Sequence, residues 1–80
     1  IAPQAPVHIV IIPREHKTKM NELVNVLGDV FKAIIEASKL ENVEESGFRI
    51  VMNKGKNAGQ AVEHLHFHLL GGRALDWPPG

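Results

Sequence analysis

Residues 63–72 of this 80-residue chain read EHLHFHLLGG, in which histidines occupy every second position. The three histidines are His64, His66 and His68. A helix would place residues two apart on different faces, whereas an extended strand places them on one face. Leu65, Phe67 and Leu69 then share the opposite face. The spacing therefore predicts a strand with one apolar side and one histidine side.

A half-exposed strand that is rich in histidine by chance is the simplest alternative, but strict alternation argues against it. Two chemistries would use such imidazoles. Neutral imidazole binds zinc well, although the sequence has no cysteine and only His8 or Glu63 could complete a ligand set. In covalent catalysis, one imidazole attacks phosphorus while its neighbours hold its tautomer and protonate the leaving group. Glycines that let phosphate approach the backbone would come from residues 54–60 and 71–72.

The composition limits the kinds of partner. Nine basic and nine acidic residues give a formal net charge of zero, which excludes the electrostatic footprint of a nucleic-acid coat or a membrane-surface binder. A small molecule or another protein is the expected partner. The absence of cysteine excludes disulfides, and no apolar run is long enough to span a bilayer or to act as a secretory signal. We therefore expect a cytoplasmic location.

The length predicts one domain with a small core, since a chain of this size buries only about 60–65% of its unfolded surface. The sequence begins at Ile1, without methionine, inside a proline-rich stretch. We therefore expect a single domain over residues 1–80 that lacks an N-terminal segment of a longer protein.

The first half of the chain predicts a strand followed by a helix. The segment 7–12 is rich in β-branched residues, contains His8 and ends before Pro13, which is typical of a buried strand. After a charged loop, in which His16 has no predicted role, apolar residues recur with the spacing of a core-facing helix. Gly28 is the expected place for a break or for close packing. The apolar helix positions are Met20, Leu23, Val24, Leu27, Val30, Phe31, Ile34, Ile35 and Leu40.

The second half predicts two more strands. Residues 48–53 alternate well enough to form one, and residues 54–60 form a glycine-containing turn. That turn joins the second strand to the histidine strand as an antiparallel hairpin. Residues 73–80 contain two adjacent prolines and should form a tail. The order strand, helix, strand, strand predicts an α+β fold with one main helix packed on an antiparallel sheet.

The stretch HLHFHLL has the pattern His-φ-His-φ-His-φ-φ (φ, apolar) of the histidine triad (HIT) family. The longer run GQAVEHLHFHLLGGRALDWPPG resembles the Hint branch, and APQAPVHIVIIPREH resembles the upstream strand and extra histidine of that branch. The resemblance implies a HIT-like fold and a homodimer that binds purine nucleotides such as AMP or GMP. It also implies hydrolysis of purine nucleoside phosphoramidates, of the AMP-amine type, without a metal or other cofactor.

The same resemblance assigns the catalytic residues. The nucleophile falls on His66, which would form a nucleotidyl-histidine intermediate. His68 would lie against the phosphate and the leaving group, while His64 and His8 would tune and orient the nucleophile. In the Hint branch the tail crosses a two-fold interface, which places Trp77 near the triad of the partner subunit.

The resemblance also assigns a set of nucleotide-binding positions. These are Ile1, Asn53, Gly59, Gln60 and Ala61, together with His66 and His68. Ile1 would line the nucleobase pocket, while Asn53 and the backbone around Gly59 would contact the ribose and phosphate. Ala61 stands where Hint proteins commonly place a serine that donates to the phosphate. Loss of one such donor costs catalysis about 3 kcal/mol, although a backbone amide or water can substitute.

The resemblance also implies two features that would precede Ile1. One is the acidic residue that holds the ribose hydroxyls, and the other is the set of strands that closes the base pocket. Two other functions also stay open. One is a nucleotide-binding regulatory or interaction module that keeps the triad but turns over little. The other is a dinucleotide polyphosphate hydrolase from another branch of the family, against which the WPPG tail argues.

Overall fold

The central strand of the sheet is β3 (Phe67–Gly71), which carries the last histidine of the triad. The computed structural model describes residues 3–80, and within them β3 lies between β1 (Val7–Ile11) and β2 (Phe48–Val51). Both neighbours run antiparallel to β3. The predicted antiparallel sheet is therefore confirmed, as is the pairing of the second strand with the histidine strand.

The register of the sheet places His8 and His68 on the same face. Val10 pairs with His68, and His8 pairs with Leu70. Val51 pairs with His68 from the other side. Because side chains alternate with a period of two, all these residues share one face. A slip of one residue between β1 and β3 would turn His8 toward the opposite face.

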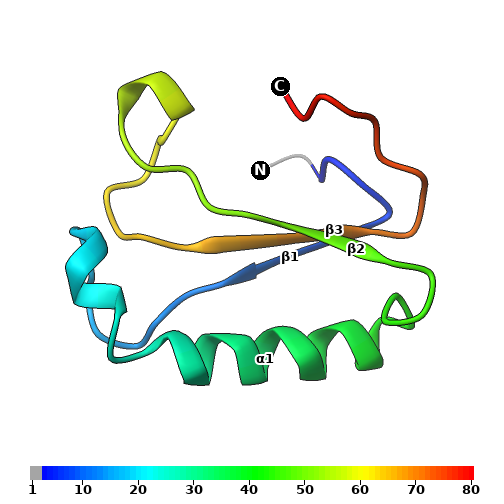
Figure 1. The fold of residues 1–80 in the computed structure, drawn as a ribbon, viewed down its shortest axis with the longest axis horizontal. Coiled ribbons are helices and arrows are strands. Elements are labelled where there is room, and N and C mark those ends of the chain that lie inside the picture. The colour runs from blue at the N-terminus through cyan, green and yellow to red at the C-terminus, as the bar shows by residue number, and fades with distance from the viewer. Residues whose placement is uncertain (1–2) are drawn as a thin grey trace.

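The other face of the sheet is covered by α1 (Leu27–Leu40), as Figure 1 shows. Leu65, Phe67 and Leu69 are only 0%, 7% and 0% exposed, so the predicted apolar side of the histidine segment is confirmed. The rest of the buried cluster consists of Leu23, Val30, Ile34 and Val43. Burial of these side chains fixes which face of β3 remains for the histidines.

Regular pairing of the histidine segment begins only at Phe67, later than the alternation predicts. The neighbouring strand β1 ends at Ile11, and Pro13 has no N–H with which to extend the ladder. Upstream of β3, the N–H of Leu65 instead donates to the carbonyl of Lys17 at 2.7 Å. The first two histidines of the triad therefore belong to a segment held by a loop.

The helix predicted from Met20 is divided into a 3-10 helix (Met20–Leu23) and α1. The break covers residues 24–26 and so precedes Gly28, where it was expected. Those residues are two valines and an asparagine, which are weak helix formers. Gly28 lies in the first turn of α1, and a Cβ there would meet nothing within 4 Å, so the alternative of close packing is also wrong.

Several apolar positions that were predicted to face the core are exposed. They are Met20, Val24, Phe31, Ile35 and Leu40, with exposed fractions of 48%, 67%, 54%, 48% and 78%. The apolar stripe of this region is wider than the surface that the three described strands can cover. One apolar face of α1 is therefore left without a partner among residues 3–80.

After β3 the chain forms the predicted tail, which has no regular secondary structure and lies on the side of the sheet away from α1 (Figure 1). Gly71 and Gly72, which were expected to serve a phosphate site, have packing roles at the far end of β3. A Cβ on Gly71 would lie 3.1 Å from Cγ1 of Val43, and Gly72 has a φ of +87° that favours glycine. No helix within residues 3–80 is long and apolar enough to cross a membrane.

The burial pattern of β3 can be tested with a matched pair of leucines, since Leu69 is 0% and Leu40 78% exposed. Leu69→Ala should lower the free energy of unfolding by about 2–5 kcal/mol, because it removes buried methyl groups and leaves a cavity. Leu40→Ala should change it by less than about 0.5 kcal/mol. Chemical denaturation measures both, and equal losses would contradict the assignment of the odd-numbered β3 residues to the core.

Candidate active site

His8 and His68 meet on the face of the sheet away from α1. Nε2 of His8 lies 2.9 Å from Nδ1 of His68, and the ring centroids are 5.1 Å apart. The resemblance assigned His8 to the orientation of His66, whereas the structure brings it to His68. The reason is the register, which pairs His8 with Leu70, two residues beyond His68, while His66 lies before the start of β3.

The hydrogen bonds of this pair assign its neutral tautomers. The main-chain N–H of Gln4 donates to Nδ1 of His8 at 3.1 Å, so this nitrogen must carry a lone pair. The proton of His8 is then on Nε2, from which it donates to Nδ1 of His68. His68 consequently carries its own proton on Nε2 and presents an N–H donor to its surroundings.

His66 receives the opposite tautomer. Its Nδ1 lies 2.9 Å from the carbonyl oxygen of His64, which can only accept, so Nδ1 carries the proton. Nε2 therefore has a lone pair, and no other group among residues 3–80 forms a hydrogen bond with it. The rings of His66 and His68 meet edge to face with centroids 4.9 Å apart. A nucleophilic nitrogen and an N–H donor thus belong to two imidazoles in contact.

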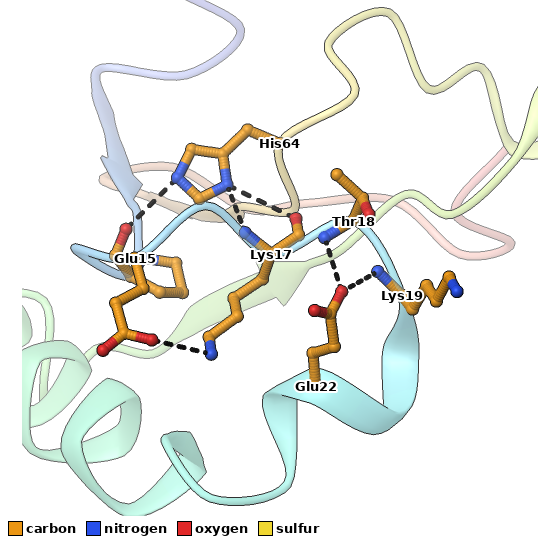
Figure 2. Close-up of polar contacts among 7 residues, drawn as sticks. Glu15, Lys17, Thr18, Lys19, Glu22 and His64 are labelled. Carbon is orange, nitrogen blue, oxygen red and sulfur yellow. Dashed lines mark hydrogen bonds and ion pairs between the residues drawn. The ribbon is translucent and has the colours of Figure 1, made fainter.

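The imidazole of His64 is turned into the loop after β1, as Figure 2 shows. Its Nδ1 accepts the N–H of Lys17 at 3.2 Å, and its Nε2 donates to the carbonyl of Pro13 at 3.2 Å. His64 therefore orients His66 through its carbonyl oxygen, while its ring anchors the loop. His16, which has no predicted role, stacks on the ring of His64 at 4.6 Å.

The same loop is held from below by Glu22 (Figure 2). Its carboxylate accepts the N–H groups of Lys19 at 2.9 Å and Thr18 at 3.1 Å. These hydrogen bonds, that from Lys19 first, lower the pKa of Glu22. Residue types alone do not predict this anchoring of residues 13–22, because all its partners except the His64 ring and the Glu22 carboxylate are main-chain groups.

A pocket of about 190 Å³ adjoins the histidine pair. Its lining consists of Gln4, His8, Val51, Asn53, His68 and Leu70. Asn53, a predicted nucleotide-binding residue, is thereby brought together with two of the predicted catalytic histidines. Ile1, predicted for the base pocket, lies outside the described residues. A larger cavity of about 400 Å³, between the loop after β1 and the start of α1, is lined by none of the histidines.

The glycine-containing turn lies before the histidine segment and includes a short 3-10 helix (Lys56–Ala58). Gly59 follows it with a φ of +77°, which favours glycine. The side-chain amide of Gln60 is used within the turn itself, although the resemblance assigned it to the nucleotide. Its partners are the N–H of Gly55 and the carbonyls of Val62 and Glu63. Ala61 is exposed and contributes no hydroxyl.

Residues 1–75 match the sequence model of the HIT domain. The chain belongs to the HIT family. Over 86 residues it is 42% identical to the adenylylsulfatase HINT1 of Arabidopsis thaliana, covering 100% of this chain and 58% of that protein. It is also 42% identical over 86 residues to the 14 kDa zinc-binding protein of Brassica juncea, covering 100% of this chain and 75% of that one.

The HIT fold is likewise shared with solved structures. A HIT family hydrolase from Legionella pneumophila superposes with a TM-score of 0.90 and 39% sequence identity, over 98% of this chain and 73% of that chain. The resemblance to the histidine triad family and the predicted fold class are therefore confirmed. The chain spans only part of each of these relatives.

His68 provides a test of the site's electrostatics. Burial lowers its pKa first, and the neighbouring His66 and His8 lower it further. An NMR titration should therefore give His68 a midpoint below the ordinary 6.5. Because the unfolded chain then binds a proton that the folded one resists, the stability should fall as the pH drops through 6.5.

The matched variant is His68→Asn, which lacks the titrating imidazole. Its free energy of unfolding should fall less steeply than that of the wild-type protein as the pH drops through 6.5. A midpoint for His68 at or above 6.5 in the folded protein would contradict the electrostatic account.

Proposed function

We propose that this HIT domain is a nucleotide-binding hydrolase that cleaves purine nucleoside phosphoramidates through a nucleotidyl intermediate on His66. The observation that carries the proposal is the set of hydrogen bonds that assigns complementary tautomers to two rings with centroids 4.9 Å apart, a lone pair on Nε2 of His66 and an N–H on Nε2 of His68. A nucleophile next to a hydrogen-bond donor is what displacement at phosphorus requires.

In the first half of the reaction, Nε2 of His66 attacks phosphorus and the P–N bond of the substrate breaks. The electron pair of that bond stays on the departing nitrogen, which leaves as an amine after it gains a proton from water. His68 donates a hydrogen bond to this nitrogen and stabilises its developing charge. The proton on Nδ1 of His66, held by the carbonyl of His64, stabilises the cationic nucleotidyl-imidazole.

In the second half, the oxygen of the same water molecule forms a bond to phosphorus, and the bond between phosphorus and Nε2 of His66 breaks. The water thus supplies one hydrogen to the amine and the hydroxyl group to the nucleoside monophosphate. His66 regains its lone pair. The lowered pKa of His68 keeps it neutral at pH 7, so it does not lose its acceptor contact with His8 during the cycle.

The pocket beside the histidine pair is the proposed place for the ribose and phosphate. Asn53 supplies an amide that can bond a sugar hydroxyl, and Val51 and Leu70 supply apolar walls. A volume of about 190 Å³ is too small for a whole nucleotide, which agrees with a site completed by further residues. We propose that Ile1, Gly59, Gln60 and Ala61 border the remainder of the nucleotide.

A second candidate substrate follows from the Arabidopsis relative, whose name is adenylylsulfatase. An adenylyl group joined to sulfate would present the same phosphorus to His66, with an oxygen rather than a nitrogen as leaving atom. Sulfate needs less help from a hydrogen-bond donor because its charge is delocalised. Relative rates on an adenosine phosphoramidate and on adenylyl sulfate separate the two candidates.

The name of the Brassica relative raises the question of zinc. Among residues 3–80 no group of three histidine or carboxylate side chains is arranged to hold a metal ion. The ring nitrogens have other uses, since His64 binds the loop with both and His8 is bonded to His68. These side chains do not fit a zinc centre, and no step of the proposed reaction uses one.

The central test concerns His66. His66→Asn should reduce turnover of an adenosine phosphoramidate by at least about 10³-fold, because it removes the nucleophile, while AMP binding persists. Mass spectrometry of the wild-type protein during turnover should detect an adenylyl adduct on the peptide containing residues 64–68.

His16→Asn is the matched control, since it also removes an imidazole, one that is exposed and stacks on the ring of His64. Near-normal turnover by His66→Asn would exclude the covalent mechanism. AMP binding without turnover by the wild-type protein would favour the regulatory module, and faster cleavage of dinucleotide polyphosphates would favour the other hydrolase.

We also propose that the protein is a homodimer. Phe31 and Ile35, one turn apart on α1, are 54% and 48% exposed and offer an apolar face to a second copy. Trp77 is 80% exposed, with its ring 5.9 Å from the guanidinium of Arg49, so residues 3–80 leave most of the indole available to a partner. We place Trp77 near the triad of the partner subunit, on the leaving-group side of the substrate.

Deletion of residues 74–80 tests the role of the tail. The truncated protein should remain dimeric, because α1 supplies the proposed contact, but its preference among leaving amines of different size should change. Analytical ultracentrifugation and a series of bulky and small amine substrates give the two readouts. Identical relative rates before and after deletion would show that the tail has no part in substrate choice.

A further inference from the structure

We propose that the main-chain N–H of Gln4, kept in position by Arg73, selects the tautomers of His8 and His68. The selection determines whether His68 presents a proton or a lone pair to the reacting group. Its consequence for catalysis rests on the proposed function, whereas the selection itself is a property of the folded protein that can be measured without substrate.

The contact between His8 and His68 cannot choose a tautomer by itself. With the proton on Nε2 of His8, that nitrogen donates to Nδ1 of His68 across 2.9 Å. In the reversed pair, Nδ1 of His68 would donate to Nε2 of His8 over the same distance, and both rings would remain neutral. The two arrangements preserve the same hydrogen bond but leave opposite groups on Nε2 of His68.

The amide of Gln4 removes this ambiguity. Its N–H points at Nδ1 of His8, 3.1 Å away, and can only donate. In the reversed pair Nδ1 of His8 would also carry a proton, so that two donors would face each other. One hydrogen bond at the start of the described chain therefore fixes the protons on two successive imidazoles.

Arg73 holds the residue that supplies this amide. Its Nη2 donates to the carbonyl of Gln4 at 2.8 Å, and its Nη1 donates to the carbonyl of Ala74 at 2.9 Å. The guanidinium thereby joins the segment before β1 to the segment after β3. Because Arg73 forms no described contact with an imidazole, it is a positioning residue that acts through Gln4.

The sharpest test changes only the amide. Gln4→Pro removes the N–H, whereas Gln4→Ala keeps it and controls for loss of the side chain. Nitrogen-15 NMR of the imidazoles at pH 7.5 reports which nitrogen of His8 and His68 is protonated. Loss of one hydrogen bond should raise the ratio of the reversed pair to the wild-type pair about two- to tenfold in Gln4→Pro, and Gln4→Ala should keep the wild-type shifts.

Arg73 offers a second pair of variants if Gln4→Pro does not fold. Arg73→Gln should move the shifts of His8 and His68 in the same direction as Gln4→Pro, and Arg73→Lys, which retains a cationic donor, should restore them in part. The inference is overturned if the folded variants that lack the amide or the guanidinium keep the wild-type nitrogen shifts.

The catalytic consequence has its own readout. Gln4→Pro and Arg73→Gln should lower kcat for an adenosine phosphoramidate by up to about twofold relative to Gln4→Ala and Arg73→Lys, because without the amide the two tautomer pairs become about equally populated. Shifted tautomers with no change in kcat would overturn the link between the tautomer of His68 and departure of the amine. A wild-type protein that cleaves no phosphoramidate would refute the proposed function, while the NMR result would still decide the tautomer selection.

Discussion

The hydrogen bond between His8 and His68 is the contact on which the chemistry proposed for this domain depends. It joins β1 to β3 on the open face of the sheet, at a distance of 2.9 Å between Nε2 and Nδ1. It exists only because the register brings residues 60 positions apart to the same face. Through it, a main-chain amide at Gln4 determines the proton on His68. His66, oriented separately by the carbonyl of His64, then supplies the complementary lone pair.

That hydrogen bond is weak compared with the packing that maintains it. A neutral hydrogen bond contributes on the order of 1 kcal/mol, whereas a buried leucine contributes about 2–5 kcal/mol. Leu65 and Leu69 are both 0% exposed and are buried on the face of the sheet opposite His68. Their burial fixes the orientation of the histidine segment. The apolar residues between the histidines therefore do more to position the imidazoles than the contacts among the imidazoles themselves.

The domain also carries apolar surface that residues 3–80 leave exposed. Phe31 and Ile35 on α1 and Trp77 in the tail are about half exposed or more. A chain of 80 residues with a small buried cluster has reason to bury such surface against a partner. The proposed dimer would use it both for stability and, through Trp77, for contact with the leaving group.

The sequence by itself determined the extended form and the buried face of the histidine segment, because a period of two in Leu65, Phe67 and Leu69 fits only an extended chain with one apolar side, although regular strand pairing begins only at Phe67. It also determined the main helix, the antiparallel pairing and, through the triad motif, the family. Tertiary structure alone decided that His8 meets His68 rather than His66, and that the ring of His64 turns into a loop. The reason is physical: alternation is a local property of the chain, whereas the partner of each ring nitrogen depends on strand register and on main-chain donors, and residue types do not encode either one directly.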